Sequence, residues 1–199
     1  MVVVKIGGSL QSSSYIKRWI KTIELQFNNS FLIIFGGGKY ADKVRKEQKV
    51  KHYDDYEAHI LAINAMKYLT EDHLCCLKNF KQIHSIEDIK KNYKKRKLLI
   101  WIPSVEEVLK FNISSNWNST SDSIALSIAN KVNAPLLLVK SIKFNKKKYL
   151  NNFFLKQNII DKDFSKNYVS SKQKISIVSR NNSYKLKKIC KDFSSNSNC

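Results

Sequence analysis

Short apolar runs alternate along the chain with longer segments in which apolar residues recur every three or four positions. The apolar runs predict buried strands at residues 2–6, 31–35, 98–103, 135–140 and 174–179. The helical spacing of apolar residues predicts helices over residues 15–27, 55–69 and 120–132. Because strands alternate with helices, we expect an α/β fold, a three-layer αβα sandwich with a mostly parallel central sheet.

Two stretches carry no such pattern. Residues 141–173 are polar and rich in lysine, and no element is assigned to them. The tail, residues 194–199, is expected to be frayed. We therefore expect a single domain over residues 1–193.

Composition and charge narrow the class of protein. With 43% hydrophobic residues the chain can bury a sizeable core, and no apolar stretch is long enough to span a membrane. The N-terminus lacks the features of a signal peptide, and the four cysteines have no metal-ligand spacing. We therefore expect a cytoplasmic protein with reduced thiols and no membrane partner.

The net charge of +20 would suit a nucleic-acid-binding protein. The basic residues are almost all lysine, with only four arginines, and asparagine is abundant while glycine and proline are scarce. Lys, Asn, Ile and Phe have AT-rich codons, so a genomic base bias accounts for this profile. Dedicated nucleic-acid sites favour arginine and exposed aromatic residues, and we expect no nucleic-acid partner.

All five glycines of the chain follow two of the predicted strands. Gly7 and Gly8 come after the first strand, and Gly36, Gly37 and Gly38 after the second. The carboxyl ends of parallel strands form a ligand crevice, where glycine lets the backbone approach an anion. Ordinary strand-to-helix turns also use glycine, but two such clusters together favour a phosphate site. Neither a P-loop motif nor a dinucleotide-binding fingerprint is present.

Three charged residues complete the pattern. Lys5 and Lys140 each lie near the end of a buried strand, and Asp122 lies in the first turn of the predicted helix 120–132. A carboxylate between two lysines would hold their ammonium groups toward a transferring phosphoryl group. Alternatively, Asp122 interacts only with the dipole of its own helix.

Four segments, "VVVKIGGSL", "FGGGKYADKVR", "WNSTSDSIALSIA" and "LLLVKS", resemble the motifs of the amino acid kinase superfamily in the same order. The resemblance covers residues 1–142, with a weaker similarity at 174–193. Within the superfamily, "GGGKYADKVRKEQ", "DDYEAHILAINAM" and "STSDSIALSIA" followed by "LLLVKS" are most similar to the small kinase of methanofuran biosynthesis.

The resemblance implies an ATP-dependent kinase with a small phosphorylated acceptor. That acceptor would be [5-(aminomethyl)furan-3-yl]methyl phosphate, which the kinase would convert to the diphosphate. Mg²⁺ would accompany ATP, and no metal-binding residues of the protein are expected. Since relatives commonly pair through helix faces, a homo-oligomer is expected as well.

The resemblance also implies site residues. The catalytic residues would be Lys5, Asp122 and Lys140, ATP phosphates would bind Gly7, Gly8, Ser9, Gly37 and Ser141, and the acceptor would bind Gly36, Gly38, Asp55 and Ser121. Asp55 would pair with the ammonium of the aminomethyl group, or it is simply a helix-start carboxylate. His59 lies one residue off the apolar stripe, and we expect it to be structural.

The sequence departs from the superfamily in its second half. Lys140-Ser141 stands where many members have Thr-Asp, no Asp-Gly pair follows it, and a closing Gly-Thr strand is missing. We therefore expect an acceptor and phosphoryl-transfer part over residues 1–130 and a shortened nucleotide-binding part over 131–193. A non-catalytic nucleotide- or anion-binding relative stays an alternative, as does a kinase for an amino acid or UMP.

Overall fold

The computed structural model describes residues 1–11, 14–26, 29–75, 77–95, 98–142 and 159–195. Its centre is a six-stranded sheet in the order β3-β4-β2-β1-β5-β6, and every neighbouring pair is parallel. The strands are β1 (Val2–Ile6), β2 (Phe31–Phe35), β3 (Lys81–Ile83), β4 (Leu98–Trp101), β5 (Leu136–Lys140) and β6 (Ile175–Ser179). β1, β2 and β4 are buried on both faces, which explains why they appear in the sequence as unbroken apolar runs.

Helices connect the strands and cover the sheet. The described α-helices are α1 (Ser14–Glu24), α2 (Gly38–Lys51), α3 (Asp55–Leu74), α4 (Ile86–Asn92), α5 (Val105–Leu109), α6 (Ser121–Lys131), α8 (Lys162–Ser170) and α9 (Leu186–Ser194). Two short 3₁₀ helices, η1 (Gly8–Leu10) and η2 (Arg180–Lys185), follow β1 and β6.

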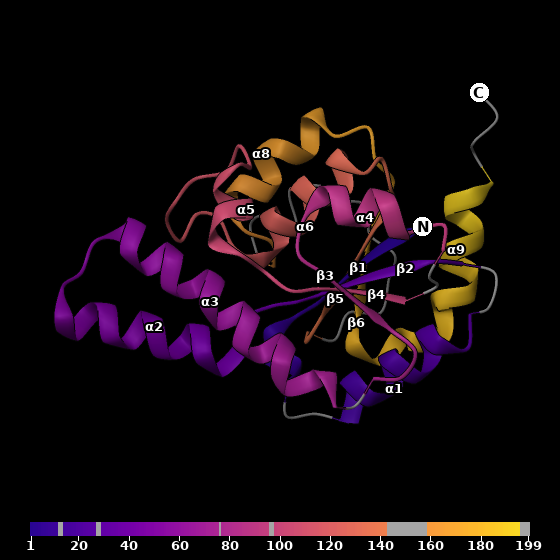
Figure 1. Ribbon diagram of the computed structural model, residues 1–199, viewed down its shortest axis with the longest axis horizontal. Helices are drawn as coiled ribbons and strands as arrows, with labels where there is room; N and C mark the ends of the chain where they lie inside the picture. The colour runs from indigo at the N-terminus through magenta and orange to yellow at the C-terminus, as the bar shows by residue number, and fades with distance from the viewer. Residues whose placement is uncertain (12–13, 27–28, 76, 96–97, 143–158, 196–199) are drawn as a thin grey trace.

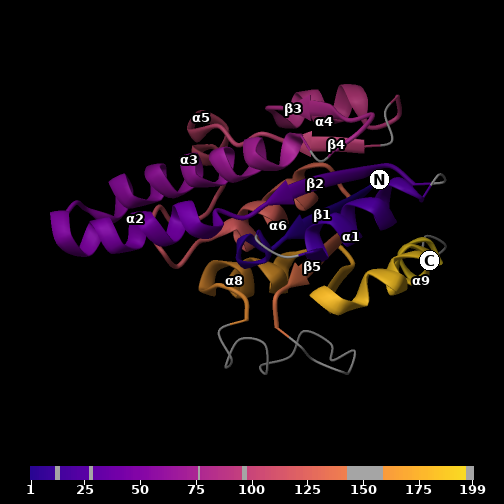
Figure 2. The ribbon, with the colours of Figure 1, turned by 90° about the horizontal axis from the view of Figure 1, so that it is seen from below.

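Two hydrophobic clusters show that the helices form a layer on each face of the sheet. On one face, alternate residues of the strands, such as Val3 and Leu138, pack against side chains of α3, α4, α5, α6 and α8. On the other face, residues such as Val4 and Ile6 pack against α1 and α9. The three layers can be followed in Figures 1 and 2. The αβα sandwich with a parallel central sheet is confirmed.

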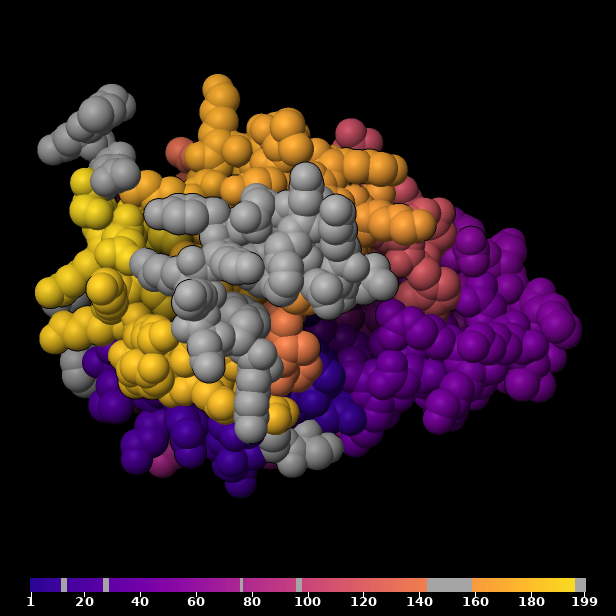
Figure 3. Space-filling model, turned by 180° about the vertical axis from the view of Figure 1, so that it is seen from behind, coloured from indigo at the N-terminus to yellow at the C-terminus, as the bar shows by residue number. Residues whose placement is uncertain are grey.

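α2 and α3 form a helical hairpin that extends beyond the carboxyl ends of the strands. α2 starts directly after the glycines that follow β2, and it packs against α3 through Val44, Ala58 and Ala65. The hairpin projects from the body of the molecule in Figures 1 and 2, and it protrudes to the right in the rear view of Figure 3.

The strands that the apolar runs predict are present, with bounds that differ by no more than two residues. The short elements β3, α4 and α5 are present without having been predicted. Within the unassigned stretch 141–173 the structure contains α8, while residues 143–158 lie outside the described residues. Of the tail expected to be frayed, Ser194 is the last residue of α9, and residues 196–199 are not described. None of the described helices is long and apolar enough to span a membrane.

Candidate active site

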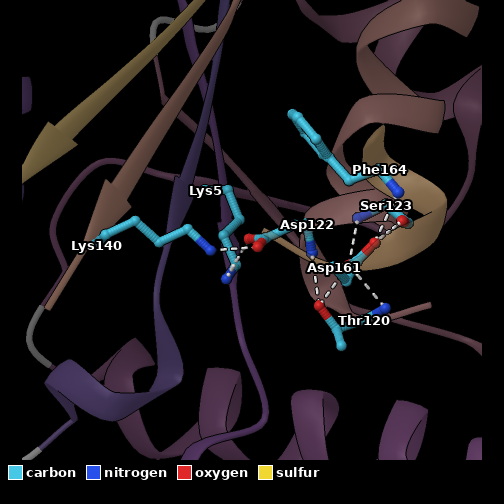
Figure 4. Close-up of polar contacts among 7 residues, drawn as sticks. All are labelled: Lys5, Thr120, Asp122, Ser123, Lys140, Asp161 and Phe164. Atoms are coloured by element: carbon cyan, nitrogen blue, oxygen red, sulfur yellow. Dashed lines mark hydrogen bonds and ion pairs between the residues drawn. The ribbon is translucent and has the colours of Figure 1, made fainter. Parts of the chain in front are cut away.

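Two lysines and one aspartate meet at the carboxyl end of the sheet. Lys5 pairs with Leu138 in the register of β1 and β5, so Lys140, two residues beyond Leu138, points to the same face as Lys5. α6 packs on that face, and its second residue is Asp122. Lys5 Nζ lies 2.8 Å from Asp122 Oδ1, and Lys140 Nζ donates a hydrogen bond to Asp122 Oδ2. Figure 4 shows both lysines pointing at this carboxylate.

The charges of this triad shift the pKa values of Asp122 and Lys140. Burial alone would raise the pKa of Asp122, but the ammonium groups of Lys140 and Lys5 lower it to about 2. Burial, together with the neighbouring Lys5 ammonium, lowers the pKa of Lys140 against the effect of Asp122. With both lysines as ammonium groups and Asp122 as a carboxylate, the triad has a net charge of one positive unit. A surplus cation that is held in place suits the binding of phosphate.

The two glycine loops touch each other beside the triad. A Cβ at Gly8 would lie 2.2 Å from the backbone nitrogen of Gly38, so no side chain fits there. Gly38 has a φ of +48°, which also disfavours any other residue. The Oε1 atom of Gln11 accepts a hydrogen bond from Lys39 N, which ties the first loop to the start of α2. The glycines are therefore required for this close approach.

Two cavities adjoin the triad. The larger has a volume of about 430 Å³, and its lining includes Lys5, Lys140, Asp122, Gly8, Ser9, Gly37, Gly38 and Ser121. The smaller has a volume of about 260 Å³, and its lining includes Lys5, Lys140, Gly7, Gly8, Ser9 and Ser141. Both ammonium-bearing residues therefore line both cavities, so one group could bind on each side of them.

The outer part of the larger cavity is partly aromatic. Trp117 lines it, and the guanidinium of Arg45 lies 4.2 Å from the centre of the indole ring. The indole Nε1 donates a hydrogen bond of 2.7 Å to Gln48 Oε1. Gln48 Nε2 in turn donates to Asp55 Oδ1, at 3.0 Å. α2 therefore holds Trp117 on the wall of the cavity through two side chains, Arg45 and Gln48.

Some of the expected site residues lie elsewhere. Asp55 is exposed at the first position of α3 and is not part of the lining of either cavity. Gly36 is buried against Gly8, because a Cβ at Gly36 would lie 2.8 Å from Gly8 N, and it lines neither cavity. His59 is 5% exposed and lines the larger cavity, and burial lowers its pKa. Among the described residues no group of three or more His, Cys, Asp or Glu side chains could hold a metal ion.

Asp161 lies next to the triad and was not among the expected site residues. It lines the larger cavity and accepts hydrogen bonds from Thr120, Ser123 and Phe164 (Figure 4). The sequence carries only a faint signal for it, an aspartate one position before a helix, which is typical of a helix cap. Gln48 was also missed, because nothing in the sequence relates it to a tryptophan 69 residues away.

Comparison with solved structures identifies the fold. The uridylate kinase of Archaeoglobus fulgidus superposes with a TM-score of 0.68 at 16% identity, over 91% of this chain and 92% of that one. This chain has the amino acid kinase fold. The UMP kinase of Ureaplasma parvum gives a TM-score of 0.65 at 15% identity, covering 89% and 88% of the two chains. An isopentenyl phosphate kinase gives 0.60 at 12% identity, covering 90% and 91%. The resemblance to amino acid kinases is thus confirmed at the level of the fold.

A sequence comparison adds a relative with a higher sequence identity than these structures. Over 130 residues the chain is 33% identical to a [5-(aminomethyl)furan-3-yl]methyl phosphate kinase from Methanocaldococcus jannaschii. The match spans 64% of this chain and 59% of the relative, which is less than two thirds of the relative's length. No family model matches the chain.

Proposed function

We propose that this protein is an ATP-dependent kinase that transfers the γ-phosphoryl group to the phosphate of a small phosphate monoester. The observation that carries this proposal is Asp122 held between two lysines whose side chains line two adjoining cavities. The kinase relative from M. jannaschii makes [5-(aminomethyl)furan-3-yl]methyl phosphate the first candidate acceptor, with the diphosphate of methanofuran biosynthesis as product.

The electrostatics of the site suit this reaction. During phosphoryl transfer, negative charge is spread over the oxygens of the transferred group, and cations that are already in position stabilise it. Lys5 and Lys140 would supply these cations, and Asp122 would hold both toward the transferred group. A phosphate monoester is an anionic nucleophile at neutral pH, so the acceptor needs no general base.

The smaller cavity suits the phosphates of ATP. Gly7, Gly8, Ser9 and Ser141 line it. The Gly7 N–H already donates to Val139 O, so Gly8 and Ser9 would offer the backbone N–H groups and Ser141 a hydroxyl. Mg²⁺ accompanies ATP in such reactions and is usually held by the phosphates and water. The carboxylate of the triad, Asp122, is already paired with two lysines, so no catalytic step is assigned to a protein-bound metal ion.

The larger cavity suits a compact acceptor with a flat ring. Ile63 and Met66 of α3 form an apolar part of its wall, and Trp117 offers an aromatic surface. Arg45 adds a positive charge at the same wall. Asp55 accepts a hydrogen bond from Gln48 and does not line the cavity, so any attraction of Asp55 for an acceptor ammonium would act from outside the cavity wall.

An ADP-release assay across four acceptors tests the proposal. The furanmethyl phosphate is expected to support turnover, whereas UMP, glutamate and aspartate are expected to support little. If UMP or glutamate is the best substrate, the protein is a kinase but the proposed furanmethyl phosphate is not its acceptor. If ATP binds and no acceptor releases ADP, the kinase proposal fails and a non-catalytic nucleotide-binding protein takes its place.

A further inference from the structure

Asp161 is a partly buried carboxylate that joins the starts of two helices. Its Oδ2 accepts hydrogen bonds from Thr120 N at 2.9 Å, Thr120 Oγ1 at 2.6 Å and Ser123 N at 3.2 Å. Its Oδ1 accepts from Phe164 N at 2.7 Å and from the Ser123 hydroxyl. Thr120 and Ser123 belong to the start of α6, and Phe164 belongs to the first turn of α8.

These contacts leave Asp161 little capacity to bind anything else. An ionised carboxylate offers about four lone-pair positions, and five donors already point at this one. Asp161 lines the larger cavity, but a metal ion or a substrate ammonium would have to displace these donors. The residue is therefore suited to holding other groups rather than to binding a ligand.

Asp122 is the residue that this arrangement controls most directly. It lies between Thr120 and Ser123, and both of these neighbours are bound by Asp161. Its backbone nitrogen also points to Thr120 Oγ1, the hydroxyl that donates to Asp161. A shift of the Thr120–Ser123 turn would therefore move the Asp122 carboxylate relative to Lys5 and Lys140.

We propose that Asp161 is a positioning residue for phosphoryl transfer: by clamping the Thr120–Ser123 turn to α8, it holds Asp122 between the two lysine ammonium groups. This inference rests on the proposed function. Asp161 and α8 thereby gain a role in a part of the chain that carries none of the sequence motifs. We call the hydrogen bonds of Asp161 to Thr120, Ser123 and Phe164 the clamp. In Figure 4 the clamp lies on the opposite side of Asp122 from the two lysines, so it can fix the position of that carboxylate without contacting the lysines.

The central variant is Asp161→Asn. The amide nitrogen cannot accept a hydrogen bond, so in either orientation at least one backbone N–H, that of Phe164 or those of Thr120 and Ser123, loses its acceptor. A displaced catalytic group costs on the order of 100-fold in rate, so kcat should fall by about that factor. The KM values for ATP and for the acceptor should stay within about threefold, because the oxygens of Asp161 are already taken by donors of α6 and α8 rather than free for a substrate.

A double-mutant comparison separates positioning from an independent effect. If Asp161 acts through Asp122, the variant carrying both Asp161→Asn and Asp122→Asn should turn over no more slowly than Asp122→Asn alone. If the two losses multiply, the proposal is overturned. The milder Ser123→Ala removes one donor to Asp161, so it should lower kcat in the same direction even if Asp161→Asn folds poorly.

Glu107 offers a matched control. It is a buried carboxylate that accepts a hydrogen bond from Ile86 N at the start of α4, and it lies outside both cavities. Glu107→Gln should lower the free energy of unfolding while kcat stays unchanged. If Glu107→Gln and Asp161→Asn lose the same fraction of kcat, the effect of Asp161→Asn is explained by general destabilisation of the protein. That result would overturn the proposal.

A second readout does not depend on kinase activity. Buried, ion-paired ammonium groups exchange their protons slowly, so NMR of ¹⁵N-lysine-labelled protein should show signals from Lys5 and Lys140, assigned with Lys5→Met. Asp161→Asn should shift or broaden these signals, and Glu107→Gln should not. If Asp161→Asn leaves them unchanged, the positioning role fails. If they change while the wild type transfers no phosphoryl group, the clamp stands and the proposed function fails.

Discussion

Replacing Lys5 by methionine tests the central cation of the site without dismantling the fold. Lys5 lies in β1, its side chain is 5% exposed, and methionine has a similar length and no charge. In Lys5→Met, Asp122 keeps its hydrogen bond from Lys140, so no buried carboxylate is left without a cation. We therefore expect the free energy of unfolding to change little.

The loss of activity follows from the charge. The triad falls from one net positive unit to none, just where the transferred phosphoryl group gains negative charge. Two unit charges about 4 Å apart interact by ~4 kcal/mol at an effective dielectric constant near 20. Removing one preorganised group that stabilises a transition state costs about 3–4 kcal/mol, and kcat should therefore fall by about 10²- to 10³-fold.

The assay is ADP release at saturating ATP and acceptor, with urea unfolding of the same preparations. Lys39→Met is the matched control, because Lys39 is also ion-paired, to Asp72 at 3.3 Å, but lines neither cavity. Its turnover should match the wild type. If Lys5→Met turned over at more than about a tenth of the wild-type rate, Lys5 would not stabilise the transferred group.

Three further outcomes are expected. Gly8→Ala places a Cβ 2.2 Å from Gly38 N, so the free energy of unfolding in urea should fall by about 1–3 kcal/mol. An unchanged free energy of unfolding would contradict the close contact of the two glycine loops. Trp117→Leu removes the aromatic part of the larger cavity's wall, so the KM for the acceptor should rise about tenfold while the KM for ATP stays unchanged. A rise in the KM for ATP instead would assign the larger cavity to the nucleotide. The pKa of Asp122 is lowered to about 2, so its contribution to stability is present above pH ~4 and is lost as the pH falls toward 2. The stability difference between the wild type and Asp122→Asn, from urea unfolding at each pH, should therefore shrink by about 2 kcal/mol over this range, and a constant difference would show that Asp122 has an ordinary pKa.

The layers of the fold, and the edge of the sheet at which the site lies, follow from the pattern of residues along the chain. Strands buried on both faces appear as unbroken apolar runs, and parallel strands bring their carboxyl ends to one edge. These rules suffice to place Lys5, Lys140 and both glycine clusters at the same edge. They also make Asp122 a candidate partner, because it stands at the start of a helix after a strand of the same sheet.

The contacts between side chains of the site depend on how whole elements pack, which the residue pattern does not reveal. The register that pairs Lys5 with Leu138 puts Lys140 on the face that α6 covers, and no local pattern encodes this register. Asp161 reaches Thr120 across 41 positions of the chain, and Gln48 reaches Trp117 across 69. Polar contacts at such separations are set by the packing of whole elements rather than by residue spacing. For the same reason Asp55, at a helix start that the sequence marks well, lies outside both cavities, while the unmarked Asp161 lies beside the triad.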